Sequence, residues 1–153
     1  GRGALGCADQ LTEIADRLAA PVVKPLLGKG ALPDDSPFTT GGIGLLGTRP
    51  SQEAMAECDT LLIAGSSFPY IEYYPKPGQA RAAQIDIDPQ RIGLRCPVEA
   101  GLVGDVGRVL EALLPRLERR SDRSFLEAAQ QGMLEWKELL HERGTRSDLP
   151  MKE

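Results

Sequence analysis

Residues 60–70 read Thr-Leu-Leu-Ile-Ala-Gly-Ser-Ser-Phe-Pro-Tyr, and this segment sets the expected fold class. The uninterrupted apolar run at 60–64 is typical of a short strand that is buried on both faces of a parallel sheet. The glycine, serines and proline that follow end the strand and begin a turn. A strand buried on both faces needs helices above and below the sheet, so helices and strands should alternate along the chain.

This alternation is present in the rest of the sequence. Further strands are predicted at short apolar runs bounded by glycine or proline: 22–23, 82–88 and 100–103. Helices are predicted where apolar residues recur every three or four positions: 11–18, 50–57 and 106–117. Residues 28–47 are rich in glycine and proline and are predicted to form a long connection. The order predicts an α/β fold, a parallel sheet with helices on both faces.

The first residues form an incomplete structural unit. A glycine turn at 1–6 leads into the first helix and then a strand, which is most of a βαβ unit without its first strand. We therefore predict a domain over residues 1–120 whose first strand is truncated, and a tail helix with a linker over 121–153. One stripe of the tail helix is apolar and is expected to pack on this domain or on a neighbouring one: Phe125, Ala129, Met133, Trp136 and Leu140.

Composition argues against several classes of protein. The 153 residues are 41% hydrophobic with a net charge of -4, which is ordinary for a soluble domain and unlike the basic surface that binds nucleic acid. No apolar run is long enough to cross a bilayer, so a cytoplasmic location is expected, with peripheral membrane contact through absent regions left open. Four arginines interleaved with acidic residues are interpreted as a solvated face or linker: Arg116, Arg119, Arg120 and Arg123.

Neither a catalytic site nor a metal site is predicted within the chain. His141 is the single histidine and lies in the tail helix, so a Ser-His-Asp triad is not expected. The cysteines Cys7, Cys58 and Cys96 are an odd set without a Cys-x-x-Cys pair. This pattern predicts free thiols and no zinc centre.

Gly1, Gly3 and Gly6 match the dinucleotide fingerprint Gly-x-Gly-x-x-Gly and open a helix. Such glycines permit a tight turn and a close approach of the backbone to a pyrophosphate at a helix N-terminus. The nicotinamide-binding form also requires a carboxylate at the end of the second strand, where this chain has Lys24. An independent nicotinamide-dependent enzyme is therefore disfavoured.

Three candidate strand ends carry small residues or carboxylates: 44–47 (Gly-Leu-Leu-Gly), 65–70 and 86–88 (Asp-Ile-Asp). Ligands of open parallel sheets bind outside the carboxyl ends of the strands. Small residues allow a close backbone approach, and a carboxylate accepts hydrogen bonds from ribose hydroxyls. Each segment alone is explained by a plain turn, and Asp88 before Pro89 also suits a helix cap. Together they favour one groove for a nucleotide.

These motifs resemble, in the same order, those of the central domains of thiamine-diphosphate-dependent enzymes. The resemblance extends to about residue 117 and rests on these segments: 28–30, 44–47, 65–70, 84–89 and 102–105. The Phe-Pro-Tyr element is similar to the pyruvate oxidase and pyruvate:quinone dehydrogenase branch. The resemblance implies a Rossmann-like central domain that binds FAD over residues 1–120, followed by the exit towards an absent C-terminal domain. It also implies an N-terminal domain and a homotetrameric parent enzyme.

In that branch the central domain holds FAD, which accepts electrons after the decarboxylation of pyruvate. The resemblance implies these contact residues for FAD: Gly44, Leu45, Leu46, Gly47, Ser66, Ser67, Phe68, Pro69, Tyr70, Asp86, Asp105 and Val106. The first four would approach the phosphates, and the next five would line the groove. Asp86 would accept bonds from ribose hydroxyls, and the last two residues would contact the adenine end.

Thiamine diphosphate and its Mg²⁺ are expected in other domains of the parent enzyme. The family holds them with Gly-Asp-Gly and a following asparagine, whereas this chain has Gly104-Asp105-Val106 and no asparagine. Catalysis is therefore expected of the parent and not of this segment. Two alternatives stay open. One is the central domain of an acetolactate synthase-like or decarboxylase-like enzyme with structural FAD or an ADP-type ligand, and the other is a nucleotide-free scaffold between the outer domains.

Overall fold

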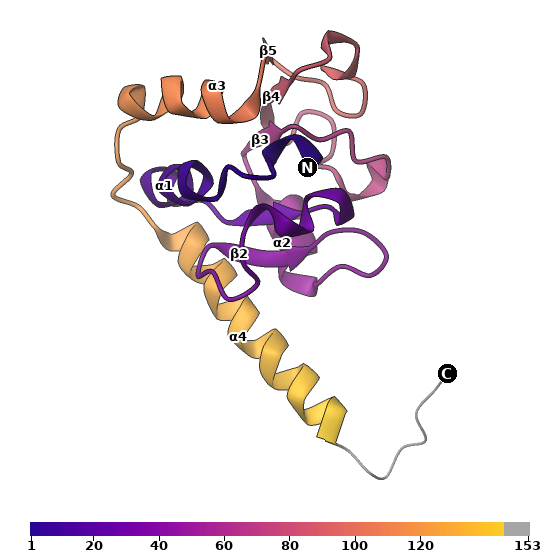
Figure 1. The fold of residues 1–153 in the computed structure, drawn as a ribbon. Coiled ribbons are helices and arrows are strands. Elements are labelled where there is room, and N and C mark those ends of the chain that lie inside the picture. Colours follow the sequence, from indigo (N-terminus) through magenta and orange to yellow (C-terminus); the bar gives the residue numbers. More distant parts are fainter. Residues whose placement is uncertain (146–153) are drawn as a thin grey trace.

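Strands and helices alternate along residues 1–145, the part of the chain that the computed structural model describes (Figure 1). The strands are β1 (Val22–Lys24), β2 (Thr39–Gly42), β3 (Thr60–Ala64), β4 (Arg81–Asp86) and β5 (Ala100–Val103). The α-helices are α1 (Ala8–Leu18), α2 (Arg49–Glu57), α3 (Val106–Leu113) and α4 (Ser124–Thr145). Short 3-10 helices are η1 (Arg2–Ala4), η2 (Leu26–Ala31), η3 (Ile71–Tyr73), η4 (Pro89–Arg91) and η5 (Leu114–Arg116).

All the paired strands are parallel. β1 pairs with β2, and β3 pairs with β4, which in turn pairs with β5. Parallel neighbours need crossover connections, and these are supplied by the helices and long loops between the strands. The predicted α/β class is confirmed. The strands nevertheless form two sheets, because no ladder joins β1 to β3 within the described residues.

β2 lies inside the segment 28–47, which the sequence predicted as a connection. Its sequence Thr-Thr-Gly-Gly contains glycines, which weaken the pattern of a strand. The strand forms because it pairs with β1, with Val22 opposite Thr39 and Lys24 opposite Gly42. The register shifts between these pairs, and Gly41 has a φ of +89° at the irregularity. Tertiary pairing therefore overrides a weak local signal.

Apolar side chains cover both faces of the larger sheet. On one face, α1 and α3 pack over Ile85 of β4 through residues that include Leu11, Ile14, Val106 and Leu110. On the other face, a smaller cluster contains Ile63, Ala82 and Cys96. Successive side chains of a strand point to opposite faces, so β3 and β4 supply both clusters.

α4 packs its first turns against α2 and β2 and then extends away from the sheets (Figure 1). Leu126 is its buried anchor, and Gln130 Nε2 donates to Pro37 O at 3.1 Å. The predicted apolar stripe omitted Leu126 and included Phe125 and Leu140, which are exposed. The other three residues of the predicted stripe, Ala129, Met133 and Trp136, are half-buried as expected. The boundary at residue 120 stays a prediction.

The segment before α4 is fixed to the end of α1. Arg119 Nη2 donates to Asp16 Oδ1 at 3.0 Å, and Arg123 donates to Asp16 O and Oδ1 at 2.9 Å each. Arg17 Nη1 donates to Leu114 O at 3.1 Å. Hydrogen bonds from Arg119 are the main reason why the pKa of Asp16 is lowered. We call Asp16, Arg17, Arg119 and Arg123 the Asp16 cluster. Arg119 and Arg123 lie in the linker between η5 and α4, in line with the interpretation as a solvated face or linker, and the structure adds their bonds to Asp16.

The cysteines Cys7, Cys58 and Cys96 are buried thiols without a disulfide. Burial raises the pKa of each thiol. No helix within residues 1–145 combines the length and apolarity needed to cross a membrane. The same residues contain no group of His, Cys, Asp and Glu side chains arranged to hold a metal ion.

Candidate ligand site at the carboxyl edge

The segments that follow β2, β3, β4 and β5 are joined into one edge by direct contacts. A Cβ placed on Gly44 would lie 3.5 Å from Phe68 Cζ. Gln84 Nε2 donates to Ser66 O at 3.3 Å, and Gly104 N donates to Asp86 O at 3.0 Å. We call residues 43–48, 65–70, 86–88 and 104–106 the carboxyl edge. The structure therefore brings the predicted strand ends together on one side of the strands.

A tight turn at 43–47 presents free backbone amides. Ile43 N donates to Lys24 O at 3.1 Å, and Gly47 N donates to Gly44 O at 2.8 Å. Gly44 has a φ of +115°, a conformation that favours glycine. The amides of Gly44, Leu45 and Leu46 donate to no acceptor among residues 1–145. Successive free amides in a turn form a concave site for an anion such as phosphate.

Thr48 connects this turn to α2. Its Oγ1 accepts a hydrogen bond from Ser51 N at 3.2 Å and donates to Thr40 O at 2.5 Å. Thr48 is therefore the N-cap of α2. Ser51 is buried, and its Oγ donates to Thr40 O at 2.9 Å. The cap fixes the turn to β2 at its base.

Phe68 joins the turn at 65–70 to Gly44 and lies within an aromatic group. Its ring centroid is 5.4 Å from that of Tyr70 and 6.0 Å from that of Tyr74. Tyr74 Oη donates to Phe68 O at 3.2 Å, and burial raises the pKa of Tyr74 to about 12. Ser66 Oγ accepts from Phe68 N at 3.3 Å. These contacts fix the turn at 65–70 to the aromatic group around Phe68.

Asp86 and Asp88 differ in how many acceptor atoms they leave free. Asp86 is only 6% exposed, and its Oδ1 accepts from Asp88 N at 3.1 Å. Its Oδ2 receives no hydrogen bond within the described part of the chain. Asp88 instead caps η4 through a 3.0 Å bond from Gln90 N and pairs with Arg91 at 3.3 Å. Asp86 therefore has an acceptor for a ligand, whereas Asp88 is already used as the expected cap.

Asp105 and Val106 lie at the far end of the edge. Asp105 Oδ1 accepts from Arg108 N at 3.1 Å and caps α3. The side chain of Val106 is buried in the core beneath α3. Val106 therefore offers a ligand only its backbone, and Asp105 offers its second carboxylate oxygen. The predicted adenine contacts at these positions are limited to those groups.

The N-terminal glycines pack against the turn after β3. Gly3 N donates to Gly65 O at 3.0 Å, and a Cβ on Gly1 would lie 2.4 Å from the same oxygen. The glycines of the fingerprint do allow a close backbone approach, but the group that they approach is the backbone of Gly65. Lys24, where a nicotinamide domain has a carboxylate, is buried and bonded to Asp34 at 2.7 Å.

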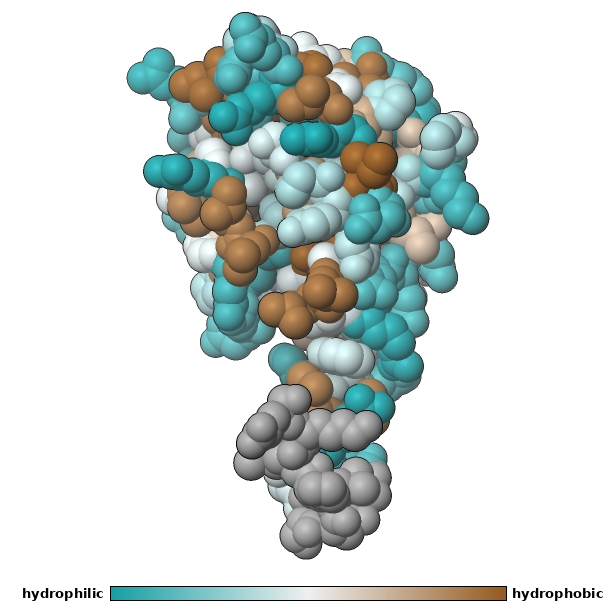
Figure 2. Space-filling view, turned by 90° about the vertical axis from the view of Figure 1, so that its right-hand side faces the viewer, coloured by the Kyte–Doolittle hydropathy of each residue, from teal (hydrophilic) through white to brown (hydrophobic). Residues whose placement is uncertain are grey.

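Large apolar side chains stand exposed along and beside the carboxyl edge: Leu26, Leu27, Leu45, Leu46, Tyr70, Ile71 and Ile87. Leu45 is 89% exposed and Leu46 is 98% exposed. Figure 2 faces the side towards which β2 points in Figure 1, and several brown apolar groups stand there among pale and teal residues.

Two residues of the site were missed by sequence reasoning. Gln84 is buried within β4 and bonds to Ser66 O, Arg91 O and Gly93 N. Arg91 Nη1 donates to Ser67 Oγ at 3.3 Å, which places a positive charge beside the turn at 65–70. A polar residue inside an otherwise apolar strand was the available signal for Gln84. Arg91 carried no signal of its own.

Comparison with known protein families bears on this arrangement. Residues 1–113 match the model of the thiamine pyrophosphate enzyme, central domain. The chain belongs to this family. The family predicted from the motifs is therefore confirmed, and the matched part of this thiamine pyrophosphate enzyme central domain contains the whole carboxyl edge.

Relatives of this central domain include proteins with different names. The chain is 42% identical over 152 residues to YdaP of Bacillus subtilis, which is named as a thiamine pyrophosphate-containing protein; the match covers 99% of this chain and 26% of YdaP. It is 35% identical over 139 residues to the acetolactate synthase large subunit of Haemophilus influenzae, covering 86% and 24%. It is 25% identical over 153 residues to the pyruvate oxidase of Lactiplantibacillus plantarum, covering 99% and 25%. The chain thus spans about a quarter of the length of these relatives.

Proposed function

We propose that this central domain binds FAD along the carboxyl edge, within an enzyme that oxidatively decarboxylates pyruvate with thiamine diphosphate. The observation that carries the proposal is the convergence of unbonded groups. The amides of Gly44, Leu45 and Leu46 and the Oδ2 of Asp86 lack partners within residues 1–145, and contacts through Phe68 and Ser66 link the two places.

These groups fit the chemistry of a dinucleotide. Free amides at the turn suit the pyrophosphate, and the guanidinium of Arg91 adds positive charge nearby. The unbonded and accessible Oδ2 of the otherwise buried Asp86 suits ribose hydroxyls. The exposed Leu45 and Leu46 suit the apolar part of a flavin or its neighbouring domain. Bound FAD would supply an electron acceptor, while these residues bind and orient it.

The pyruvate-oxidising activity is supported by the Phe68-Pro69-Tyr70 element and by the pyruvate oxidase relative, which aligns with 99% of this chain. In this proposal the outer domains hold thiamine diphosphate and Mg²⁺, and the parent enzyme is a cytoplasmic homotetramer. A second candidate is favoured by the higher identity, 35%, to an acetolactate synthase large subunit. In that case FAD or an ADP-type ligand would occupy the same edge in a structural role.

Spectroscopy of the purified full-length protein separates these candidates. We expect flavin absorbance, and we expect it to bleach when pyruvate and thiamine diphosphate are added without oxygen. Flavin that stays oxidised while pyruvate is consumed would favour the structural role. A colourless protein that turns over pyruvate would contradict FAD binding.

The site is tested by Asp86→Ala, with Asp88→Ala as the matched control. We expect Asp86→Ala to weaken FAD binding by roughly 10- to 100-fold, because a hydrogen bond to a charged group contributes about 1.5–3 kcal/mol. Asp88→Ala removes a carboxylate two residues away that caps η4, so FAD affinity should hardly change. Equal affinity in the wild type and both folded variants would remove Asp86 from the site.

A further inference from the structure

Gln84 is a polar side chain buried inside the larger sheet. It lies in β4, and only 3% of it is exposed. Ala82 and Asp86 lie on the same face of the strand, because successive side chains alternate between the faces. Ala82 belongs to an apolar cluster, whereas Asp86 supplies the free acceptor of the carboxyl edge. Gln84 therefore stands between the core and the candidate ligand site.

The amide of Gln84 bonds to backbone groups of two separate segments. Its Nε2 donates to Ser66 O at 3.3 Å and to Arg91 O at 3.0 Å, and its Oε1 accepts from Gly93 N at 2.9 Å. Ser66 follows β3, whereas Arg91 and Gly93 follow β4. Burying an amide costs free energy unless its groups are hydrogen-bonded, and here both ends of the amide are. One planar group thus ties together two turns beside Asp86.

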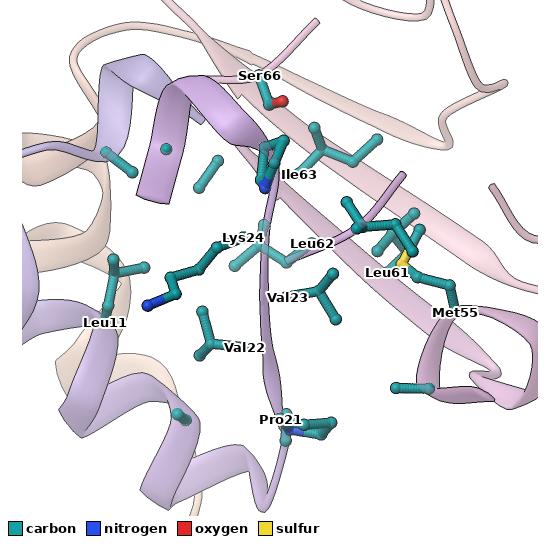
Figure 3. Close-up of a pocket in the computed structure, with 18 of the residues that line it drawn as sticks. Leu11, Pro21, Val22, Val23, Lys24, Met55, Leu61, Leu62, Ile63 and Ser66 are labelled. Carbon is teal, nitrogen blue, oxygen red and sulfur yellow. The ribbon is translucent and has the colours of Figure 1, made fainter. Parts of the chain in front are cut away.

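The turn after β3 depends on this side chain. Figure 3 shows Ser66 where the chain leaves β3, past Leu62 and Ile63, beside an apolar pocket that lies between β1 and β3. Ser66 O accepts no second hydrogen bond among residues 1–145. Removal of the Gln84 amide would therefore leave this carbonyl without a partner in the described part of the chain.

A second contact joins the same two segments. Arg91 Nη1 donates to Ser67 Oγ at 3.3 Å, but the Arg91 side chain is 53% exposed. Exposed side chains change rotamer rapidly, so this contact holds the turns less firmly than a buried amide does. The backbone of Arg91, from which the guanidinium extends, is itself held by Gln84.

We infer that Gln84 is a positioning residue for the ligand of the carboxyl edge, which sets the place of Ser66 and Ser67 relative to Asp86. The inference rests on the proposed FAD site. Gln84 is too buried to contact a ligand itself, and it acts through the two turns. A ligand that contacts several segments at once needs their groups held to within about 0.5 Å, and supporting hydrogen bonds provide this precision.

The bonding pattern requires an amide at this position. Two N–H donors face carbonyl oxygens, and one acceptor faces an N–H. Gln84→Met keeps the length of the side chain and removes all three bonds. Gln84→Glu keeps the shape, but an ionised carboxylate would direct an acceptor towards Ser66 O and Arg91 O.

Protonation should partly restore the Gln84→Glu variant. A protonated carboxyl regains one O–H donor. Burial and the carboxylate of Asp86 on the same face would raise the pKa of the introduced carboxyl. The guanidinium of Arg91 is directed instead to Ser67 and Asp88. The pH dependence of this variant therefore reports on the lost donor, and not only on the loss of packing.

Gln79 offers a matched control at the opposite end of β4. Its Nε2 donates to Met55 O at 3.4 Å and to Cys58 O at 3.0 Å, and its Oε1 accepts from Lys76 N at 3.2 Å. It makes the same three kinds of bond, but it precedes β4 and lies outside the carboxyl edge. Substitutions of Gln79 should lower stability and leave the FAD affinity of the folded protein unchanged.

Fluorescence titration of the full-length protein with FAD, after removal of bound nucleotide, tests the inference alongside urea denaturation. We expect Gln84→Met to raise the Kd roughly tenfold, as for the loss of one or two neutral hydrogen bonds. Gln84→Glu should do the same at about pH 8 and should approach the wild-type Kd at about pH 6. Gln79→Met and Gln79→Glu should match the wild type at each pH.

The outcomes separate this inference from the proposed FAD site. A wild-type protein that does not bind FAD would overturn both. FAD binding by the wild type, with the same Kd in both folded Gln84 variants at every pH, would overturn the inference alone. An equal loss of affinity in the Gln79 variants would also overturn it, because affinity would then follow stability. If Gln84→Met does not fold, the pH dependence of Gln84→Glu decides.

Discussion

The two ends of the strands differ in whether their polar groups have hydrogen-bond partners within the chain. At the amino end, the carboxylate of Asp16 accepts bonds from Arg119 and Arg123. At the carboxyl edge, the amides of residues 44–46 and Oδ2 of Asp86 have no partner within the described chain. Polar groups with internal partners contribute to stability, whereas unbonded groups gain most from a ligand.

This difference has a practical consequence for substitutions. A change in the Asp16 cluster should alter the free energy of unfolding without altering ligand affinity. A change at the carboxyl edge should alter affinity by more than its effect on stability accounts for. A substitution in the core between the two ends gives a reference value for the change in the free energy of unfolding.

The largest effect on stability is expected at Ile85, which is fully buried in β4 between the two ends. Ile85→Ala should lower the free energy of unfolding by about 2–5 kcal/mol, because it removes packed methyl groups and leaves a cavity. The matched control is Ile87→Ala, since Ile87 is 74% exposed two residues later. That change should stay within about 0.5 kcal/mol. Similar urea-denaturation midpoints for both variants would contradict the assigned core.

The next largest effect concerns ligand affinity at Gly44. Gly44→Ala places a side chain at a φ of +115°, so the turn that presents the free amides must rearrange. We expect the Kd for FAD to rise roughly tenfold, equivalent to about 1.4 kcal/mol. Gly78→Ala is the control, because Gly78 also has a positive φ, +81°, but lies before β4 and outside the carboxyl edge. A fluorescence titration in which both variants bind FAD equally well would remove the turn from the site.

A smaller effect is expected at the amino end. Arg123→Ala removes two hydrogen bonds to Asp16 and should lower the free energy of unfolding by about 1 kcal/mol, since the guanidinium is partly exposed. FAD affinity should not change. Arg108→Ala is the control, because the Arg108 guanidinium has no hydrogen-bond partner within residues 1–145. A loss of FAD affinity in folded Arg123→Ala protein would contradict the claim that the amino end affects stability alone.

The smallest effect is a dependence of stability on pH. The lowered pKa of Asp16 means that its ionised form is favoured by folding, chiefly through the hydrogen bond from Arg119. This contribution is complete above the usual pKa of 3.8 and is lost as pH falls through the lowered value. The stability difference between wild type and Asp16→Asn should therefore be constant near neutrality and shrink below a pH of about 4. If the stability difference between wild type and Asp16→Asn grew as the pH fell, it would contradict a lowered pKa for Asp16.

The sequence predicted the parts of the fold that have strong local patterns. The apolar run of β3 and the periodicity of α1 and α3 identified parallel α/β structure before any contact was known. β2 was missed because its glycines remove the apolar pattern, and its existence depends on pairing with β1. Local signals therefore located most elements, and a nonlocal pairing decided the remaining strand.

The candidate site was predictable only in part. Glycines and carboxylates at strand ends located Gly44 and Asp86, since the parallel topology places such ends together. Sequence could not distinguish Asp86 from Asp88 by their free acceptor atoms. It also could not reveal that Arg119 and Arg123 reach Asp16, because that contact spans about a hundred residues.

Photo-crosslinking tests most directly whether the carboxyl edge holds the nucleotide. The full-length protein, freed of bound nucleotide, would be labelled with 8-azido-FAD and its peptides mapped by mass spectrometry. We predict label in peptides that contain residues 43–48, 65–70, 86–88 or 104–106, and loss of that label when unmodified FAD competes. Competable label confined to peptides of the Asp16 cluster, or absent from every carboxyl-edge peptide, would contradict the account.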